Sequence, residues 1–69
     1  MIKGYKFLAC TYIILHGGKT IYIKDKLDRF LEQYWNEECE HITCRVANFF
    51  KREIISIAKE NIYYYGKVY

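Results

Sequence analysis

The chain has 69 residues, enough for one domain but too few for both a core and a deep catalytic cleft. Apolar residues make up 52% of the sequence and charged residues 28%, a balance that excludes an intrinsically disordered chain. The net charge of +3 is compatible with an acidic protein or a nucleic acid as partner and requires neither.

Three further features of the composition narrow the class of protein. The sequence has no proline and eight tyrosines, and its abundance of Lys, Ile, Tyr and Asn is typical of AT-rich coding sequences such as those of phages and mobile elements. Its three cysteines cannot form a closed disulfide framework, which favours a reducing cytoplasm. No apolar run reaches the roughly 18 residues needed to cross a membrane, so we expect no membrane partner.

The N-terminal third predicts a β-hairpin. Residues 5–15 and 19–24 are rich in β-branched and aromatic side chains, and Gly17-Gly18 between them matches a two-residue type I′ turn. That turn pairs Ile14 with Ile21 and Tyr12 with Ile23. One face, expected to be the core side, then carries Leu8, Cys10, Tyr12, Ile14, Ile21 and Ile23. The other carries Tyr5, Phe7, Thr11, Ile13, Leu15, Thr20, Tyr22 and Lys24.

Two helices are predicted next. Asp25 is a candidate N-cap for a helix at 26–38, whose apolar stripe consists of Leu27, Phe30, Leu31, Tyr34 and Trp35. Glutamates at 37, 38 and 40 should fray its C-terminal end. A second helix is predicted at 44–60, capped by Thr43, with a stripe formed by Ala47, Phe50, Ile54, Ile57 and Ala58. An alternative interpretation makes residues 41–49 a strand, because apolar and polar residues alternate there.

The last eight residues, 62–69, predict a terminal strand. Ile62, Tyr64 and Val68 share one face, and Tyr63, Tyr65, Lys67 and Tyr69 share the other. The predicted fold is therefore a single α+β domain covering residues 1–69, with the order β-β-α-α-β.

No catalytic pattern is found, so we expect no enzyme and no cofactor. Gly17-Gly18 is a turn and not a phosphate-binding loop. One cluster resembles a metal-ligand set, because Cys39, His41 and Cys44 lie within six residues and Cys10 or His16 could complete a zinc site. The spacing lacks the paired Cys-x-x-Cys pattern, which favours cysteines that are small buried side chains.

The tyrosines indicate a partner-binding surface. On the sheet face opposite the helices, the candidate residues are Tyr22, Lys24, Tyr63, Tyr65, Lys67 and Tyr69. Tyrosine is favoured at protein interfaces, so the leading hypothesis is a small non-enzymatic module that occludes a host protein as an inhibitor or adaptor, or pairs with a second copy. The alternative is a nucleic-acid-binding protein, in which the same rings stack on bases and Arg45, Arg52 and Lys59 form a basic stripe along the second helix. A zinc-supported domain is a third interpretation.

Overall fold

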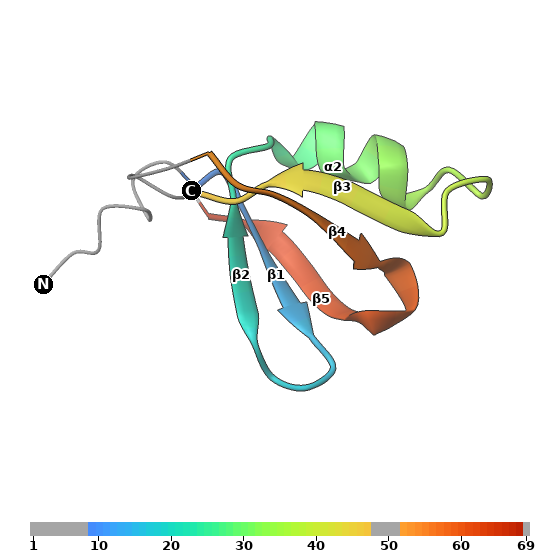
Figure 1. Cartoon of the computed structure of the whole chain (residues 1–69), viewed down its shortest axis with the longest axis horizontal. Helices are drawn as coiled ribbons and strands as arrows, with labels where there is room; N and C mark the ends of the chain where they lie inside the picture. Colours follow the sequence, from blue (N-terminus) through green and yellow to red (C-terminus); the bar gives the residue numbers. More distant parts are fainter. Residues whose placement is uncertain (1–8, 48–51, 69) are drawn as a thin grey trace, which may run out of the picture.

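The structure, a computed structural model, describes residues 9–47 and 52–68. Within these residues the secondary-structure elements are β1 (Thr11–Leu15), β2 (Thr20–Ile23), α2 (Leu27–Tyr34), β3 (His41–Arg45), β4 (Ile54–Ala58), the 3-10 helix η1 (Lys59–Asn61) and β5 (Ile62–Lys67). β2, β1 and β5 form one antiparallel sheet in that order, and β3 and β4 form a second. As Figure 1 shows, α2 lies beside β3, and η1 turns the chain from β4 into β5.

The predicted order β-β-α-α-β is wrong, because strands occupy the place of the second helix. β3 and β4 pair antiparallel, with Ile42 opposite Ile57 and Cys44 opposite Ile55. Ile42, Cys44 and Ile57 are buried, so the core is built with the two-residue period of a strand. The helical spacing of Ile54, Ile57 and Ala58 was a coincidence within a short apolar run, and the alternative strand is confirmed over His41–Arg45.

The first helix is confirmed but ends earlier than predicted, at Tyr34. Its apolar stripe packs Phe30 into the core. Asp25 does not cap it: Lys26 holds the N-cap position and makes no side-chain cap bond.

The hairpin is also confirmed, but its register differs by one residue from the prediction. The Gly18 N–H donates to Leu15 O and the Leu15 N–H to Lys19 O, both over 2.8 Å, which closes a three-residue loop. Of the two turn glycines, Gly18 alone takes a positive φ, of 91°, whereas a type I′ turn needs two such residues. Ile13 therefore lies opposite Ile21. Its side chain occupies the core, and the predicted core face of β1 is inverted.

The terminal strand is confirmed over Ile62–Lys67, but its faces differ from the prediction. The pairing of β1 with β5 shifts between Ile14 and Leu15, so Leu15 is opposite Ile62 and Ile14 is opposite Tyr64. This bulge brings both Ile62 and Tyr65 to the core side. The parts of the predicted strands and helix at residues 5–8, 48–51 and 69 lie outside the described residues.

One core joins the two sheets. Ile13 and Ile23 from the three-stranded sheet pack with Ile42 and Ile57 from the β3–β4 hairpin and with Phe30 from α2. An isolated bridge between Ile23 and Val46 links the end of β2 to the end of β3. In the described part of the chain, no helix has the length and apolar character to cross a membrane.

Candidate functional site

An aromatic cluster lies where the end of α2 meets β5. Buried Phe30 contacts Tyr65 at a ring-centroid distance of 4.9 Å and stacks on Tyr34 at 5.6 Å. Tyr34 and Tyr65 are 5.0 Å apart, and Trp35 stands edge-on against Tyr34 at 5.1 Å. We call Tyr34, Trp35 and Tyr65 the aromatic surface. Its rings have few rotatable bonds and rest on a buried base, so the surface is rigid.

Trp35 is the most exposed member of this surface, with 69% of its area accessible. The sequence predicted it as a core residue of a helix reaching residue 38. Because α2 ends at Tyr34, Trp35 occupies the C-cap position, and its side chain leaves the buried stripe. The three glutamates that follow were the signal that the helix would end here.

Two further aromatic pairs flank β5. Tyr63, also 69% exposed, contacts the His16 ring edge-on at 5.6 Å near the hairpin tip. The ring centroids of Tyr64 and Tyr12 are 6.3 Å apart. The Tyr12 ring lies directly over Gly66, where a Cβ would come within 2.7 Å of it. β5 therefore presents rings on both of its faces.

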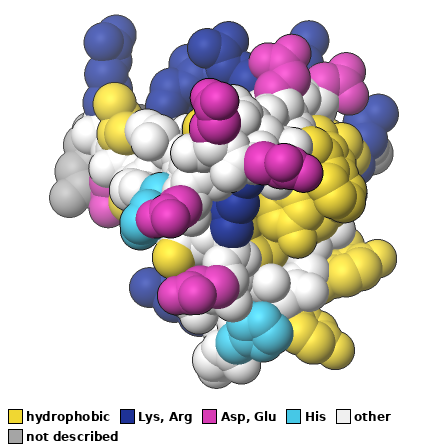
Figure 2. All heavy atoms as spheres, turned by 90° about the vertical axis from the view of Figure 1, so that its right-hand side faces the viewer, with side chains coloured by type: hydrophobic (Ala, Val, Ile, Leu, Met, Phe, Trp, Pro, Cys, Tyr) yellow, Lys and Arg dark blue, Asp and Glu magenta, His cyan; other side chains and the backbone are white. Residues whose placement is uncertain are grey.

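An acidic loop follows Trp35 in the chain. The loop after Trp35 carries Glu37, Glu38 and Glu40, and Glu60 of η1 lines the same hollow as Glu37 and Glu40. Figure 2 shows this end of the molecule, with a broad hydrophobic patch beside several acidic side chains. A phosphate backbone would be repelled here, whereas a basic protein surface would be attracted.

The predicted partner-binding residues do not share one face. Ile13 lies opposite both Ile21 and Tyr65 on the core side of the sheet, while Tyr12 lies opposite Tyr22 and Gly66 on the other side. The structure thus separates Tyr22 from Tyr65. Lys67 is opposite Thr11 and belongs to the row of the sheet that contains Tyr65. Tyr69 lies outside the described residues.

Tyr22 and Lys24 line two hollows away from the aromatic surface. Tyr22 borders a groove of about 350 Å³ between β2 and the β3–β4 hairpin, with Ile21 and Val46 in its walls. Lys24 lines a shallow hollow with Lys26, Arg29 and Arg45. Of the predicted residues, Tyr65 contacts the Tyr34 ring, against which Trp35 stands, whereas Tyr63 contacts His16 at the tip of the β1–β2 hairpin.

The predicted basic stripe is not assembled, because its helix does not exist. Arg45 ends β3, Arg52 precedes β4, and Lys59 begins η1 at the opposite end of the hairpin. The Lys59 ammonium donates to the Asn36 carbonyl, and the Arg45 guanidinium pairs with Asp25.

The four candidate metal ligands are also dispersed. No group of three or more His, Cys, Asp or Glu side chains that could hold a metal ion occurs among the described residues, which include Cys10, Cys39, His41 and Cys44. Cys44 is buried on β3, and His41, three residues earlier, points to the other face and is exposed. Burial, with a smaller contribution from Asp25, raises the pKa of the Cys44 thiol from 9.0 to about 11. This thiol is a poor metal ligand and a poor nucleophile at neutral pH.

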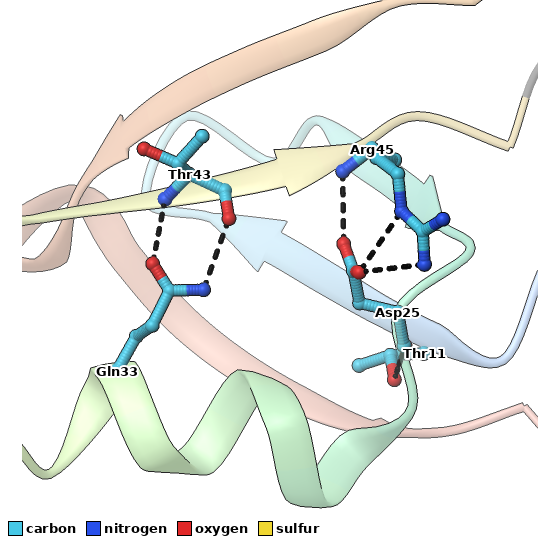
Figure 3. Close-up of polar contacts among 5 residues, drawn as sticks. All are labelled: Thr11, Asp25, Gln33, Thr43 and Arg45. Carbon is cyan, nitrogen blue, oxygen red and sulfur yellow. Dashed lines mark hydrogen bonds and ion pairs between the residues drawn. The ribbon is translucent and has the colours of Figure 1, made fainter.

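Side chains close the outer edge of β3, as Figure 3 shows. The Gln33 amide donates to Thr43 O and accepts from Thr43 N, both over 3.0 Å. The Asp25 carboxylate accepts from the Arg45 N–H at 2.8 Å and from the Arg45 guanidinium at 3.1 Å. The Asp25 carbonyl accepts from the Thr11 hydroxyl at 2.7 Å. These contacts fasten the β3–β4 hairpin to α2 and β1. They also prevent another strand from pairing with the outer edge of β3.

Comparison with known proteins finds no family model, no curated protein and no solved structure that matches this chain.

Proposed function

We propose that this chain is a small non-enzymatic module that binds another protein through the aromatic surface. The exposed Trp35 carries the proposal. A tryptophan that is 69% exposed and held against Tyr34 costs solvation and contributes little to the core. Tryptophan and tyrosine dominate the binding energy of protein interfaces, and rigid rings lose little entropy on binding.

The chemistry of the rim indicates the kind of partner. Glu37, Glu40 and Glu60 line one hollow together with Lys59, and the first two belong to the loop that follows Trp35, so the partner is expected to offer an apolar pocket for Trp35 surrounded by lysine or arginine. Charge complementarity of this type raises the association rate and makes it sensitive to salt. Binding would act by occlusion, as in an inhibitor or adaptor. The unpaired Cys10, Cys39 and Cys44 suit a reducing compartment such as the cytoplasm.

Affinity capture with matched variants tests the proposal. Wild-type, Trp35→Ala and Tyr64→Ala chains are immobilised and exposed to lysate of the organism that encodes the chain. Tyr64 is the control because its ring is 56% exposed and lies on the face of β5 opposite to Tyr65. A protein held by wild type and by Tyr64→Ala, but bound at least about tenfold more weakly by Trp35→Ala, supports the proposal.

The captured protein is then titrated against the purified chain at two salt concentrations, where the affinity should fall as salt rises. Equal retention by Trp35→Ala and wild type would refute the role of the aromatic surface. Recovery of nucleic acid, with oligonucleotide binding that is strong at low salt, would replace this function with the nucleic-acid alternative.

A further inference from the structure

The outer edge of β4 presents main-chain groups in the pattern of a strand that lacks a neighbour. The Val46 N–H donates to Glu53 O at 2.8 Å, and the Lys59 N–H donates to Glu40 O at 3.0 Å. Odd-numbered residues between 53 and 59 thus bond to β3. The alternation of an antiparallel ladder points the N–H and C=O groups of the even-numbered residues away from β3. These are Ile54, Ser56 and Ala58, and no described residue bonds to their outward groups.

The charges at the two ends of β4 make this edge complementary to itself. Arg52 and Glu53 precede the strand, and Lys59 and Glu60 follow it. If two copies of β4 pair antiparallel with Ser56 opposite Ser56, Glu53 of one copy faces Lys59 of the other. Glu60 belongs to the 3-10 helix η1, where the chain leaves the strand, so the charge pair of the ladder is Glu53 with Lys59, formed once at each end of the symmetric pair. Directly opposed charges of opposite sign stabilise an antiparallel pair, and like charges destabilise it.

The register is specified by the same residues. A shift of two residues in either direction removes both charge pairs, and one of the two shifts sets Ile54 opposite Glu60. In the central register Ile54 faces Ala58, and Ile55 faces Ile57, a pairing of β-branched side chains that suits a sheet.

We propose that β4 is a self-association edge and that its occupant is β4 of a second copy of this chain. The two-fold axis passes between the paired Ser56 residues, as an isologous dimer requires. The hairpin sheets of the two copies then join into one four-stranded sheet. The exposed Ile54 lies at this edge, and the acceptor and donor groups of Ile54, Ser56 and Ala58 find partners. The edge of β3 cannot serve in the same way, because Gln33 and Asp25 occupy it.

This inference does not depend on the proposed function. Trp35 takes no part in the β4 edge, so the dimer would present two aromatic surfaces to a partner. Two linked surfaces bind a repeated or dimeric target more tightly than one does.

A charge-swap series tests the proposal by light scattering across a range of protein concentrations. Wild type should approach twice its monomer mass of 8.4 kDa as concentration rises. Glu53→Lys places a lysine opposite Lys59 of the other copy, and the symmetry of the dimer repeats this repulsion at its other end. We therefore expect dimerisation to weaken about tenfold. Adding Lys59→Glu restores opposite charges and should restore the dimer. Glu32→Lys is the matched control, with the same change in net charge at an exposed position of α2 away from β4, and should dimerise as wild type does.

A second variant guards against misfolding, because Lys59 also bonds to the Asn36 carbonyl. Ser56→Pro removes an outward N–H that bonds to no described residue, so it should weaken dimerisation without loss of a hydrogen bond within the monomer, with folding verified by circular dichroism. A wild-type chain that stays monomeric to millimolar concentration overturns the proposal. So does a folded Glu53→Lys chain that dimerises as well as Glu32→Lys.

Discussion

β3 and β4 belong to one hairpin, yet their outer edges differ in chemistry. On β3, the amide of Gln33 satisfies both main-chain groups of Thr43, and Asp25 accepts from the Arg45 N–H. On β4, the groups of Ser56 find no partner among the described residues. A chain this small cannot cover both edges with its own backbone, and it closes one of them with side chains from the α2 region. The difference restricts strand pairing to β4 and directs any sheet extension to one side of the molecule.

Amide hydrogen exchange measures this difference directly, and we expect it to give the largest effect. The Thr43 and Arg45 amides are bonded to buried or half-buried side chains and should exchange only when the hairpin opens. The Ser56 amide in dilute monomer should exchange at least about a hundredfold faster. Equal protection of Thr43 and Ser56 at low concentration would remove the distinction. A concentration-dependent slowing at Ser56 alone would report pairing of β4.

Asp25→Ala should produce the largest loss of stability among substitutions at the β3 edge. It deprives the Arg45 N–H of its acceptor and the half-exposed guanidinium of its counter-ion. We expect a loss of about 3 kcal/mol in the free energy of unfolding, measured by urea denaturation. Asp28→Ala, at an exposed position in the first turn of α2, is the control and should change stability by less than about 0.5 kcal/mol. Similar values for the two variants would show that the Asp25 contacts do not fasten the hairpin.

Gln33→Ala should cost less, about 1–2 kcal/mol, because two hydrogen bonds near the surface are lost. It also exposes the main chain at Thr43, so larger oligomers should form at high concentration. Glu32→Ala changes the preceding, exposed position of α2, and it should neither lower the stability nor promote larger oligomers. If Gln33→Ala remains as stable and as soluble as Glu32→Ala, the Gln33 amide is not needed to protect the outer edge of β3.

The sequence patterns identified local elements better than their faces. Gly17-Gly18, the stripe from Leu27 to Tyr34 and the β-branched terminus predicted a hairpin, a helix and a strand that are all present. A single extra loop residue at the hairpin then inverted the side-chain pattern of β1, because the period of a strand is two. The second helix failed because residues 54–58 match both periods, and short apolar runs leave that choice to tertiary packing.

The candidate site was only partly predictable for the same reason. Tyr65 was expected from composition and strand pattern. The exposure of Trp35 depends on a helix that ends four residues earlier than the predicted bound of residue 38. The contacts of Gln33 with Thr43 and of Asp25 with Arg45 join residues 10 and 20 positions apart. No local pattern encodes such contacts, because they exist only after the hairpin docks.

The pH dependence of stability that Cys44 causes is the smallest expected effect. It tests how tightly the β3–β4 hairpin packs against the core, because Cys44 is buried on β3. Its thiol pKa is about 11 in the folded chain and near 9.0 when exposed. The folded state therefore retains a proton that the unfolded state loses as pH rises from 9 to 11, and stability falls across that window by about 1–2 kcal/mol. Below pH 9 both states keep the proton, and the contribution is constant. Tyrosines and lysines titrate in the same range, so the measurement is the difference between wild type and Cys44→Ala in urea midpoints from pH 8 to 11. Identical slopes would mean that the thiol is solvated and that the hairpin opens more readily than its bonds to Gln33 and Asp25 imply.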